Sequence, residues 1–315
     1  MLGSKDAPLD VYLASVFAVK LLLAKLETKE PSSTNSKPVD YSDAVWAKLP
    51  LPKIKTAELL EYQNTTTPKI GLLVATEVER QAMLKRIRPP KGRRAVVQVF
   101  CNKNTCYLGR LGVTDVVMTM TGMGSLGRDS SALVVSEFID DWTLSAVVMA
   151  GIAFGKDSAK QRIGQVLVSD RIISYEPQRV GEETDQNRGE IHSAGATLLN
   201  RFRNVVGWNF ESPKGLACGI QCGPLLSGEK LVDNAGFKAD LFQRYPTAIG
   251  GEMEGVGVAS AASRRGCEWI VVKSICDWGD GTKQKMHQGF SAAASISLVE
   301  HVFNQLGALD ALINK

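Results

Sequence analysis

Apolar runs alternate along most of this chain with segments of helical periodicity. The clearest run, KIGLLVA, has the length of a buried β-strand and is bounded by polar residues. Together with KIGLLVA, further apolar runs predict strands at residues 69–75, 95–101, 105–111, 113–121, 145–151, 164–176, 215–222 and 268–276. Segments of helical spacing predict helices at residues 77–87, 125–138, 190–206, 231–243, 255–265 and 289–313. Such alternation of strands and helices is typical of an α/β fold.

The first 66 residues have a different pattern. Residues 9–29 are rich in Leu, Ala, Lys and Val and predict a helix, whereas EPSSTNSKP at residues 30–38 predicts a linker. A short helix is expected near residues 42–49, and polar NTTTP then precedes the first strong strand. We therefore predict a helical extension over residues 1–66 and an α/β domain over residues 67–315.

The apolar stretch at residues 11–24 bears on membranes and on assembly. It carries Lys20 and is shorter than the roughly 17 to 25 apolar residues of a spanning helix. A secretory signal stays open as an alternative, although only Lys5 supplies positive charge upstream and no clear cleavage site follows. Because the stretch is too short to span, we expect no membrane partner. An isolated helix of about 20 residues does not leave an apolar surface in water, so we expect self-association, as a dimer or hexamer.

Composition narrows the class of protein further. A chain of 315 residues with 44% hydrophobic and 22% charged residues can bury the core of one large domain. Its net charge of +4 does not by itself indicate a nucleic-acid partner. The six cysteines include no CxxC and accompany three histidines, so we expect no metal site and a reducing, cytoplasmic location.

Three carboxylates stand where active-site residues usually lie. Glu79 begins a helix after the first strong strand, Glu254 lies in GGEMEG, and Asp277 directly follows the buried strand in ICDWGD. Each also has a structural explanation, since the helix dipole favours Glu in a first turn and Asp is a common turn residue. The combination of all three is more specific than any one of them.

The order of the motifs carries a resemblance. KIGLLVATEVE, TGMG, GIAFG, IGQVLVSD, GPLLSGEKLV, GGEMEG and ICDWGD follow one another from about residue 69 onward. This order resembles the purine nucleoside phosphorylase and uridine phosphorylase superfamily, and within it the methylthioadenosine/S-adenosylhomocysteine nucleosidases. The resemblance implies a three-layer α/β/α fold around a central mixed sheet. It also implies an enzyme that cleaves an adenine N-ribosyl bond in a small nucleoside or nucleotide without a cofactor.

By this resemblance the three carboxylates acquire roles. Asp277 gives or shares a proton with adenine N7, Glu254 binds the ribose hydroxyls and Glu79 activates water on the opposite face of the sugar. Cleaving the bond builds positive charge on ribose and negative charge on the base, so a proton donor and nearby anions fit the chemistry. A phosphorylase would need phosphate at the position of Glu79, where a carboxylate about 4 Å away costs on the order of 1 to 4 kcal/mol. Hydrolysis is therefore expected.

The resemblance also implies residues that hold the substrate. Met253 corresponds to a residue that packs on the sugar, while Leu231 and Val232 match a segment that frames adenine through backbone groups. Gly151 and Ala153 of GIAFG belong to the same expected substrate site.

A departure from the simple nucleosidase pattern concerns the 5′ end of the substrate. Ile152 follows the glycine of GIAFG where a serine is usual, and GIAFGKDSAKQR is similar to nucleosidase domains of immune effectors, including antiphage enzymes that cleave ATP. The basic residues that could then receive phosphates are Lys156, Lys160, Arg162 and Arg179. Gly122 and Gly124 could add backbone N–H groups. A solvated loop of mixed charge is the alternative reading.

Two functions of different classes therefore remain open. The first is an adenine N-ribosyl hydrolase, acting on ATP in immune defence or on methylthioadenosine. The second is a nucleotide-binding module without catalysis that signals through its N-terminal helix, and the intact set of three carboxylates argues against it. The isolated histidines His192, His287 and His301 suggest no further catalyst.

Overall fold

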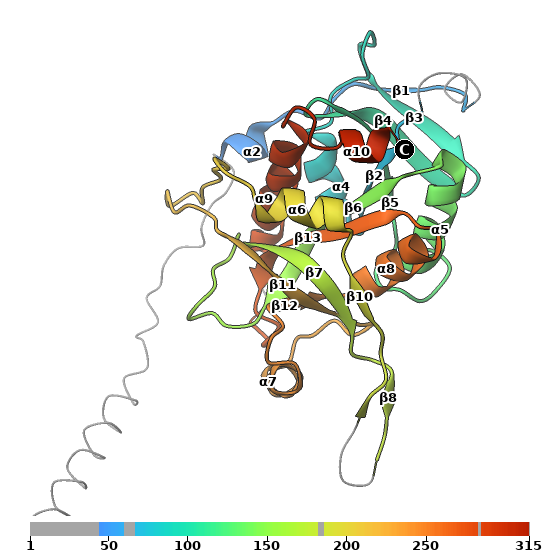
Figure 1. Ribbon diagram of the computed structural model, residues 1–315. Coiled ribbons are helices and arrows are strands. Elements are labelled where there is room, and N and C mark those ends of the chain that lie inside the picture. The colour runs from blue at the N-terminus through green and yellow to red at the C-terminus, as the bar shows by residue number, and fades with distance from the viewer. Residues whose placement is uncertain (1–43, 60–66, 182–185, 283–284, 315) are drawn as a thin grey trace, which may run out of the picture. The chain divides into compact units, whose positions relative to one another are not determined.

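A mixed β-sheet runs through the part of the chain that the structure describes, which is residues 44–59, 67–181, 186–282 and 285–314 of a computed structural model (Figure 1). The strands follow one another across the sheet in the order β1 (Ile54–Thr56), β3 (Val96–Cys101), β4 (Asn104–Leu111), β5 (Thr114–Met120), β2 (Ile70–Val74), β6 (Ala146–Gly155), β12 (Gly250–Glu252), β11 (Ile220–Ser227), β7 (Val166–Ser174) and β10 (Ile191–Ser193). In addition, β13 (Glu268–Asp277) pairs with β6 and β7, and β8 (Gln178–Arg179) pairs with β9 (Gln186–Asn187).

Helices cover both faces of the sheet, as the alternation of side chains along β2 requires. Ile70, Leu72 and Val74 face a core shared with α4 (Glu77–Leu84), α6 (Ala196–Arg203), α9 (Met286–Phe303) and α10 (Asp310–Ile313). Leu73 faces the opposite core, which is shared with α5 (Ser131–Trp142) and α8 (Gly255–Arg264). The predicted three-layer α/β/α arrangement with a central mixed sheet is confirmed.

The shared direction of the central strands positions the site. β2 and β13 both pair in parallel with β6, so the three strands end at the same edge of the sheet. α4 follows β2 there, and a third apolar cluster, in which Val232 packs near α7 (Ala235–Arg244), lies at the end of β6. Ligands of open α/β sheets usually bind at such an edge.

Some helices of the structure have other bounds than the sequence predicts. The helix expected at residues 125–138 begins at Ser131, because Gly124 (φ 83°) and Gly127 (φ 103°) hold the preceding loop in a left-handed backbone conformation. The segment expected as one helix at residues 190–206 is β10 followed by α6. The last predicted helix is divided into α9 and α10 near Gly307 (φ 76°).

The region before the family-like motifs contributes to the same sheet. α2 (Val45–Lys48) lies within the predicted helix near residues 42–49, and β1 pairs in parallel with β3. The predicted helix over residues 9–29 and its linker lie outside the described residues. Within the described ranges no helix is both long enough and apolar enough to cross a bilayer.

Candidate active site

A pocket lies at the edge of the sheet where β2, β6 and β13 end. All three predicted carboxylates line it. The predicted substrate residues that also line it are Ala153, Leu231, Val232 and Met253. Residues more than 190 positions apart in the sequence thus share one cavity.

Glu79 is held at the start of α4 by its own capping interactions. The Thr76 hydroxyl accepts the N–H of Glu79, and Glu79 Oε2 accepts the N–H groups of Ala75 and Thr76 at 2.8 and 2.9 Å. Oε1 accepts the Ile152 N–H at 2.8 Å. An ionised carboxylate offers about four acceptor positions, so this buried side chain keeps one for a further donor.

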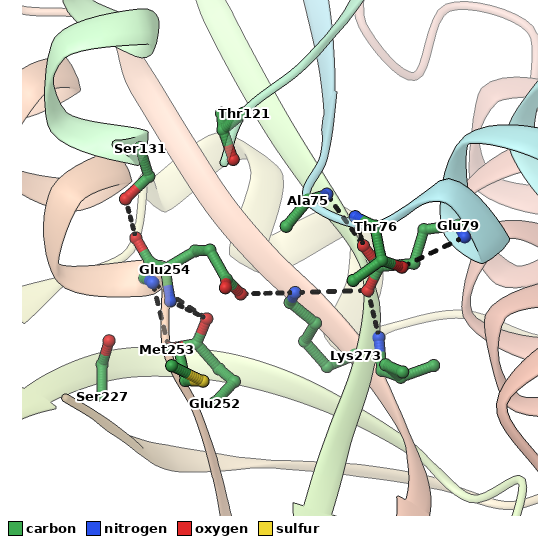
Figure 2. Close-up of polar contacts among 12 residues, drawn as sticks. Ala75, Thr76, Glu79, Thr121, Ser131, Ser227, Glu252, Met253, Glu254 and Lys273 are labelled. Carbon is green, nitrogen blue, oxygen red and sulfur yellow. Dashed lines mark hydrogen bonds and ion pairs between the residues drawn. The ribbon is translucent and has the colours of Figure 1, made fainter. Parts of the chain in front are cut away.

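Lys273 joins two of the carboxylates. Figure 2 shows its ammonium between Glu79 and Glu254, with Nζ at 3.6 Å from Glu79 Oε1 and 3.2 Å from Glu254 Oε2. Burial of its side chain disfavours the charge, but the carboxylates of Glu79, Glu254 and Glu252 raise the pKa of Lys273 above its ordinary value. Lys273 is therefore a buried cation shared by two anions.

Glu254 has partners on each carboxylate oxygen. Oε1 accepts the N–H of Gly124 at 3.1 Å and Oε2 accepts from Lys273. The Ser131 hydroxyl donates to the backbone carbonyl of Glu254 at 2.8 Å, which ties the segment to the start of α5. The residue is 5% exposed and lines the pocket, so the orientation of its side chain is set by the protein rather than by solvent.

Asp277, the last residue of β13, lines the pocket. Its Oδ1 accepts the Gly279 N–H at 3.0 Å and its Oδ2 accepts the thiol of Cys276 at 3.1 Å. Gly279 has a φ of 62°, a conformation that a glycine adopts without strain. Its absent Cβ would lie 3.2 Å from the Val232 carbonyl, which brings the acid close to the predicted adenine-framing segment.

Gly151 lies beneath the carboxylates rather than in the pocket wall. A Cβ at this position would lie 1.9 Å from Glu79 Oε1 and 2.9 Å from Lys273 Nζ. Only glycine leaves that space free for the ion pair.

The two other predicted glycines do not offer free N–H groups. The Gly122 N–H donates to the Asp129 carbonyl, and the Gly124 N–H donates to Glu254 Oε1. Each donor is thus already used within the protein, and phosphate binding by these two N–H groups stays a prediction.

The predicted phosphate-binding residues lie outside the pocket lining in this structure. Lys156 donates to the Pro246 carbonyl and lies over the Phe242 ring, while Lys160 is 85% exposed and pairs with Asp157. Arg162 and Arg179 are exposed. These contacts resemble those of a solvated loop of mixed charge, the alternative reading of this segment.

Sequence reasoning missed two residues of the site, Lys273 and Glu252. The signal for Lys273 was a single lysine within the apolar strand EWIVVKSIC, since a buried lysine requires anionic partners. The signal for Glu252 was the first acid of GGEMEG, two residues before Glu254; it is 4% exposed and lines the pocket. Within the described residues no group of His, Cys, Asp and Glu side chains is arranged to hold a metal ion.

Known proteins are similar to this chain in sequence. Residues 69–305 match the family model described as the phosphorylase superfamily. The chain is 31% identical over 254 residues to the death domain-containing ATP nucleosidase of Amphimedon queenslandica, covering 74% of this chain and 48% of that protein. It is 24% identical over 239 residues to the 5′-methylthioadenosine/S-adenosylhomocysteine nucleosidase of Maridesulfovibrio salexigens, covering 73% of this chain and 95% of that protein. It thus spans about half the length of the first relative and nearly all of the second.

Solved structures show the same fold. The methylthioadenosine/S-adenosylhomocysteine nucleosidase of Colwellia psychrerythraea, solved in complex with adenine, superposes with a TM-score of 0.63 at 20% identity, covering 76% of this chain and 96% of that one. The family match covers most of the chain, and the sheet, its two helical layers and the pocket at the strand ends agree with it. The chain belongs to the phosphorylase superfamily.

Proposed function

We propose that this chain is an adenine N-ribosyl hydrolase, which uses water to release adenine from a nucleoside or nucleotide. The observation that carries the proposal is the meeting of Glu79, Glu254 and Asp277 in one pocket. They come from α4, from the segment before α8 and from the end of β13. Its relatives in two branches bear names of adenine-nucleoside hydrolases.

Asp277 acts in this proposal as the proton donor to the leaving base. The bond between C1′ and the base breaks with its electron pair moving to the base, and the proton neutralises the developing charge. Its two oxygens are oriented by the Gly279 N–H and the Cys276 thiol. Leu231 and Val232 line the same pocket, where they would frame the adenine ring.

Glu79 acts on the nucleophile. Three backbone N–H groups and the nearby Lys273 ammonium fix its carboxylate, to which a water in the pocket would donate a hydrogen bond. As the water oxygen bonds to C1′, Glu79 takes up its proton. Lys273 lies between the two carboxylates and offsets their mutual repulsion.

Glu254 binds the ribose hydroxyls and supplies negative charge to a sugar that becomes positive in the transition state. Met253 lines the pocket beside it and would pack on the sugar. Both oxygens of Glu254 are already held, so little reorganisation is needed when ribose binds.

Water rather than phosphate is the nucleophile in this proposal. A phosphate seated beside Glu79 and Glu254 would meet two buried carboxylates, and no arginine belongs to the described lining of the pocket. Repulsion at about 4 Å costs on the order of 1 to 4 kcal/mol per carboxylate. Neutral water avoids that cost.

For the substrate we favour a 5′-phosphorylated adenine nucleotide such as ATP, which agrees with the name of the relative that is 31% identical. Lys230 lines the pocket and supplies a cation there, where it pairs with Glu176. Methylthioadenosine is the second candidate, because Met123, Ile152 and Phe154 give part of the lining an apolar character that suits a methylthio group.

A substrate series tests the proposal. ATP, AMP, adenosine, methylthioadenosine and inosine are incubated separately with the protein, and free base is quantified by chromatography. Release of adenine from at least one adenine compound is expected, with ATP the best substrate. Release from none of them would refute the proposed hydrolase, and a preference for methylthioadenosine would select the second candidate.

A further inference from the structure

Glu252 is a buried acid in the pocket wall that the proposed chemistry does not use. It is the last residue of the short strand β12, it is 4% exposed, and it lies two residues before Glu254. A buried carboxylate costs free energy unless hydrogen bonds or charges compensate it. Its partners therefore indicate what it does.

The partners of Glu252 are the backbone N–H groups at the start of α8. Its Oε2 accepts the N–H groups of Glu254 and Gly255, each at 2.9 Å, and its Oε1 also lies 3.0 Å from the Gly255 nitrogen (Figure 2). The Ser227 hydroxyl, which is opposite Glu252 in the β11–β12 register, accepts the next N–H, from Val256, at 3.0 Å. The first turn of the helix is thus capped from two neighbouring strands.

This arrangement frees the side chain of Glu254. Glu254 occupies the N-cap position of α8, where a side chain commonly accepts the first N–H groups of its own helix, yet it makes no such bond. Because Glu252 caps in its place, the Glu254 carboxylate extends toward Gly124 and Lys273 instead.

The close contact between Glu252 and the helix depends on a glycine. A Cβ at Gly255 would lie 2.6 Å from Glu252 Oε1 and 2.8 Å from a methyl carbon of Ile172. The positive end of the helix dipole further favours an anion here. The motif GGEMEG thus places one acid for capping and one for the pocket.

We propose that Glu252 is the positioning residue of this site, which fixes the ribose-binding carboxylate of Glu254 by capping α8 from outside the helix. The inference rests on the proposed function, because it assigns Glu254 to ribose. Glu252 does not itself touch the reacting atoms. It acts through the backbone of Glu254 and Gly255.

The charges around Glu252 give this role a dependence on pH. Glu254 faces it from the start of α8, Lys273 from β13, the Ser227 hydroxyl from β11 and the Tyr175 ring from the chain after β7. Burial and the neighbouring Glu254 raise the pKa of Glu252 to about 7, against the opposing effect of Lys273. Because its pKa is raised, the ionised fraction of Glu252 grows as pH rises through neutrality, and the ionised form makes the stronger bonds to N–H groups.

Two substitutions test the inference with the substrate for which the wild type is active. E252A removes the cap and should raise KM for the nucleoside by about tenfold or more, with inhibition by free adenine unchanged, since the proposed function assigns Glu254 to ribose and not to adenine. E252Q keeps one acceptor oxygen and no charge. At pH 6 the KM of E252Q should be within about threefold of the wild-type KM. At pH 8 the ratio of the variant KM to the wild-type KM should be larger by at least about a further threefold.

Glu268 offers a matched control. It caps α6 in the same way, accepting the N–H groups of Thr197 and Leu198 at 3.1 and 3.2 Å, but it lies outside the pocket lining. E268A should lower thermal stability and leave KM unchanged.

The outcomes separate the two claims. A wild type that releases no base refutes the proposed function, and this inference falls with it. With an active wild type, unchanged KM in E252A would overturn the positioning role. An equal loss of adenine and nucleoside affinity would also overturn it. Should E252A fail to fold, E252Q decides, and a KM equal to that of the wild type at both pH 6 and pH 8 would overturn the role.

Discussion

At the scale of single residues, Glu79, Glu254 and Asp277 line one pocket, and Lys273 lies between the first two. The positions of the three acids could be predicted because motif order carries them. Lys273 could not, since a lysine in an apolar strand becomes meaningful only when parallel pairing brings β13 beside β6 and sets its ammonium between two carboxylates. The four basic residues predicted to contact phosphate lie outside the pocket lining, because sequence proximity to GIAFG does not fix the direction of a loop. Phosphate binding by them stays a prediction.

The role of Asp277 gives a direct residue-scale prediction. Asp277→Asn keeps the acceptor for the Gly279 N–H but cannot deliver an acidic proton, so kcat should fall by about 10²- to 10⁴-fold. Base release is followed by chromatography and the fold by circular dichroism. Turnover near that of the wild type would remove Asp277 from the mechanism.

Lys273 allows a prediction about stability. Lys273→Met leaves Glu79 and Glu254 buried without their shared cation, and the free energy of unfolding should fall by about 3 to 5 kcal/mol. Lys273→Arg, which retains the charge, should lose less. Urea denaturation measures both, and a Met variant as stable as the wild type would show that the ion pair does not stabilise the fold.

At the scale of elements, apolar runs predicted the strands well and boundaries less well. The start of α5 was misplaced because residues 125–130 have no helix-breaking proline, while the left-handed Gly124 and Gly127 that delay the helix are ordinary glycines in sequence. β12 is only three residues long and was missed, although it carries Glu252. Short strands of this kind are defined by their neighbours rather than by their own pattern.

β6 passes beneath the carboxylates, and its Gly151 lies against Glu79. Gly151→Ala inserts a methyl group where Glu79 Oε1 lies, so Glu79 must move and kcat should fall by about tenfold or more. Gly219→Ala is the control, because its Cβ would meet only Gln165 Cγ at 4.0 Å. Equal activity of the two variants would show that the Glu79 geometry is not critical.

At the scale of the whole molecule, the α/β/α architecture was predictable because strands and helices alternate, whereas the contribution of residues before 67 was not. β1 was absent from the predictions, since its three residues are exposed and gain their order from pairing with β3. The self-association expected from residues 9–29 is still a prediction.

Deleting residues 1–43 tests that expectation while sparing α2 and β1, which belong to the described fold. If the predicted helix associates through its apolar face, the mass measured by light scattering should decrease to a smaller assembly. An unchanged mass would indicate that assembly takes place through the α/β domain.

The identity of the sugar product tests the central claim most directly. The wild-type protein is incubated with its best adenine substrate at increasing phosphate concentrations, and the sugar is identified by mass spectrometry while adenine is quantified. The proposed hydrolysis predicts one sugar with a free anomeric hydroxyl for each adenine released, at a rate that phosphate does not increase. A sugar 1-phosphate as the main product, formed faster as phosphate rises, would contradict it.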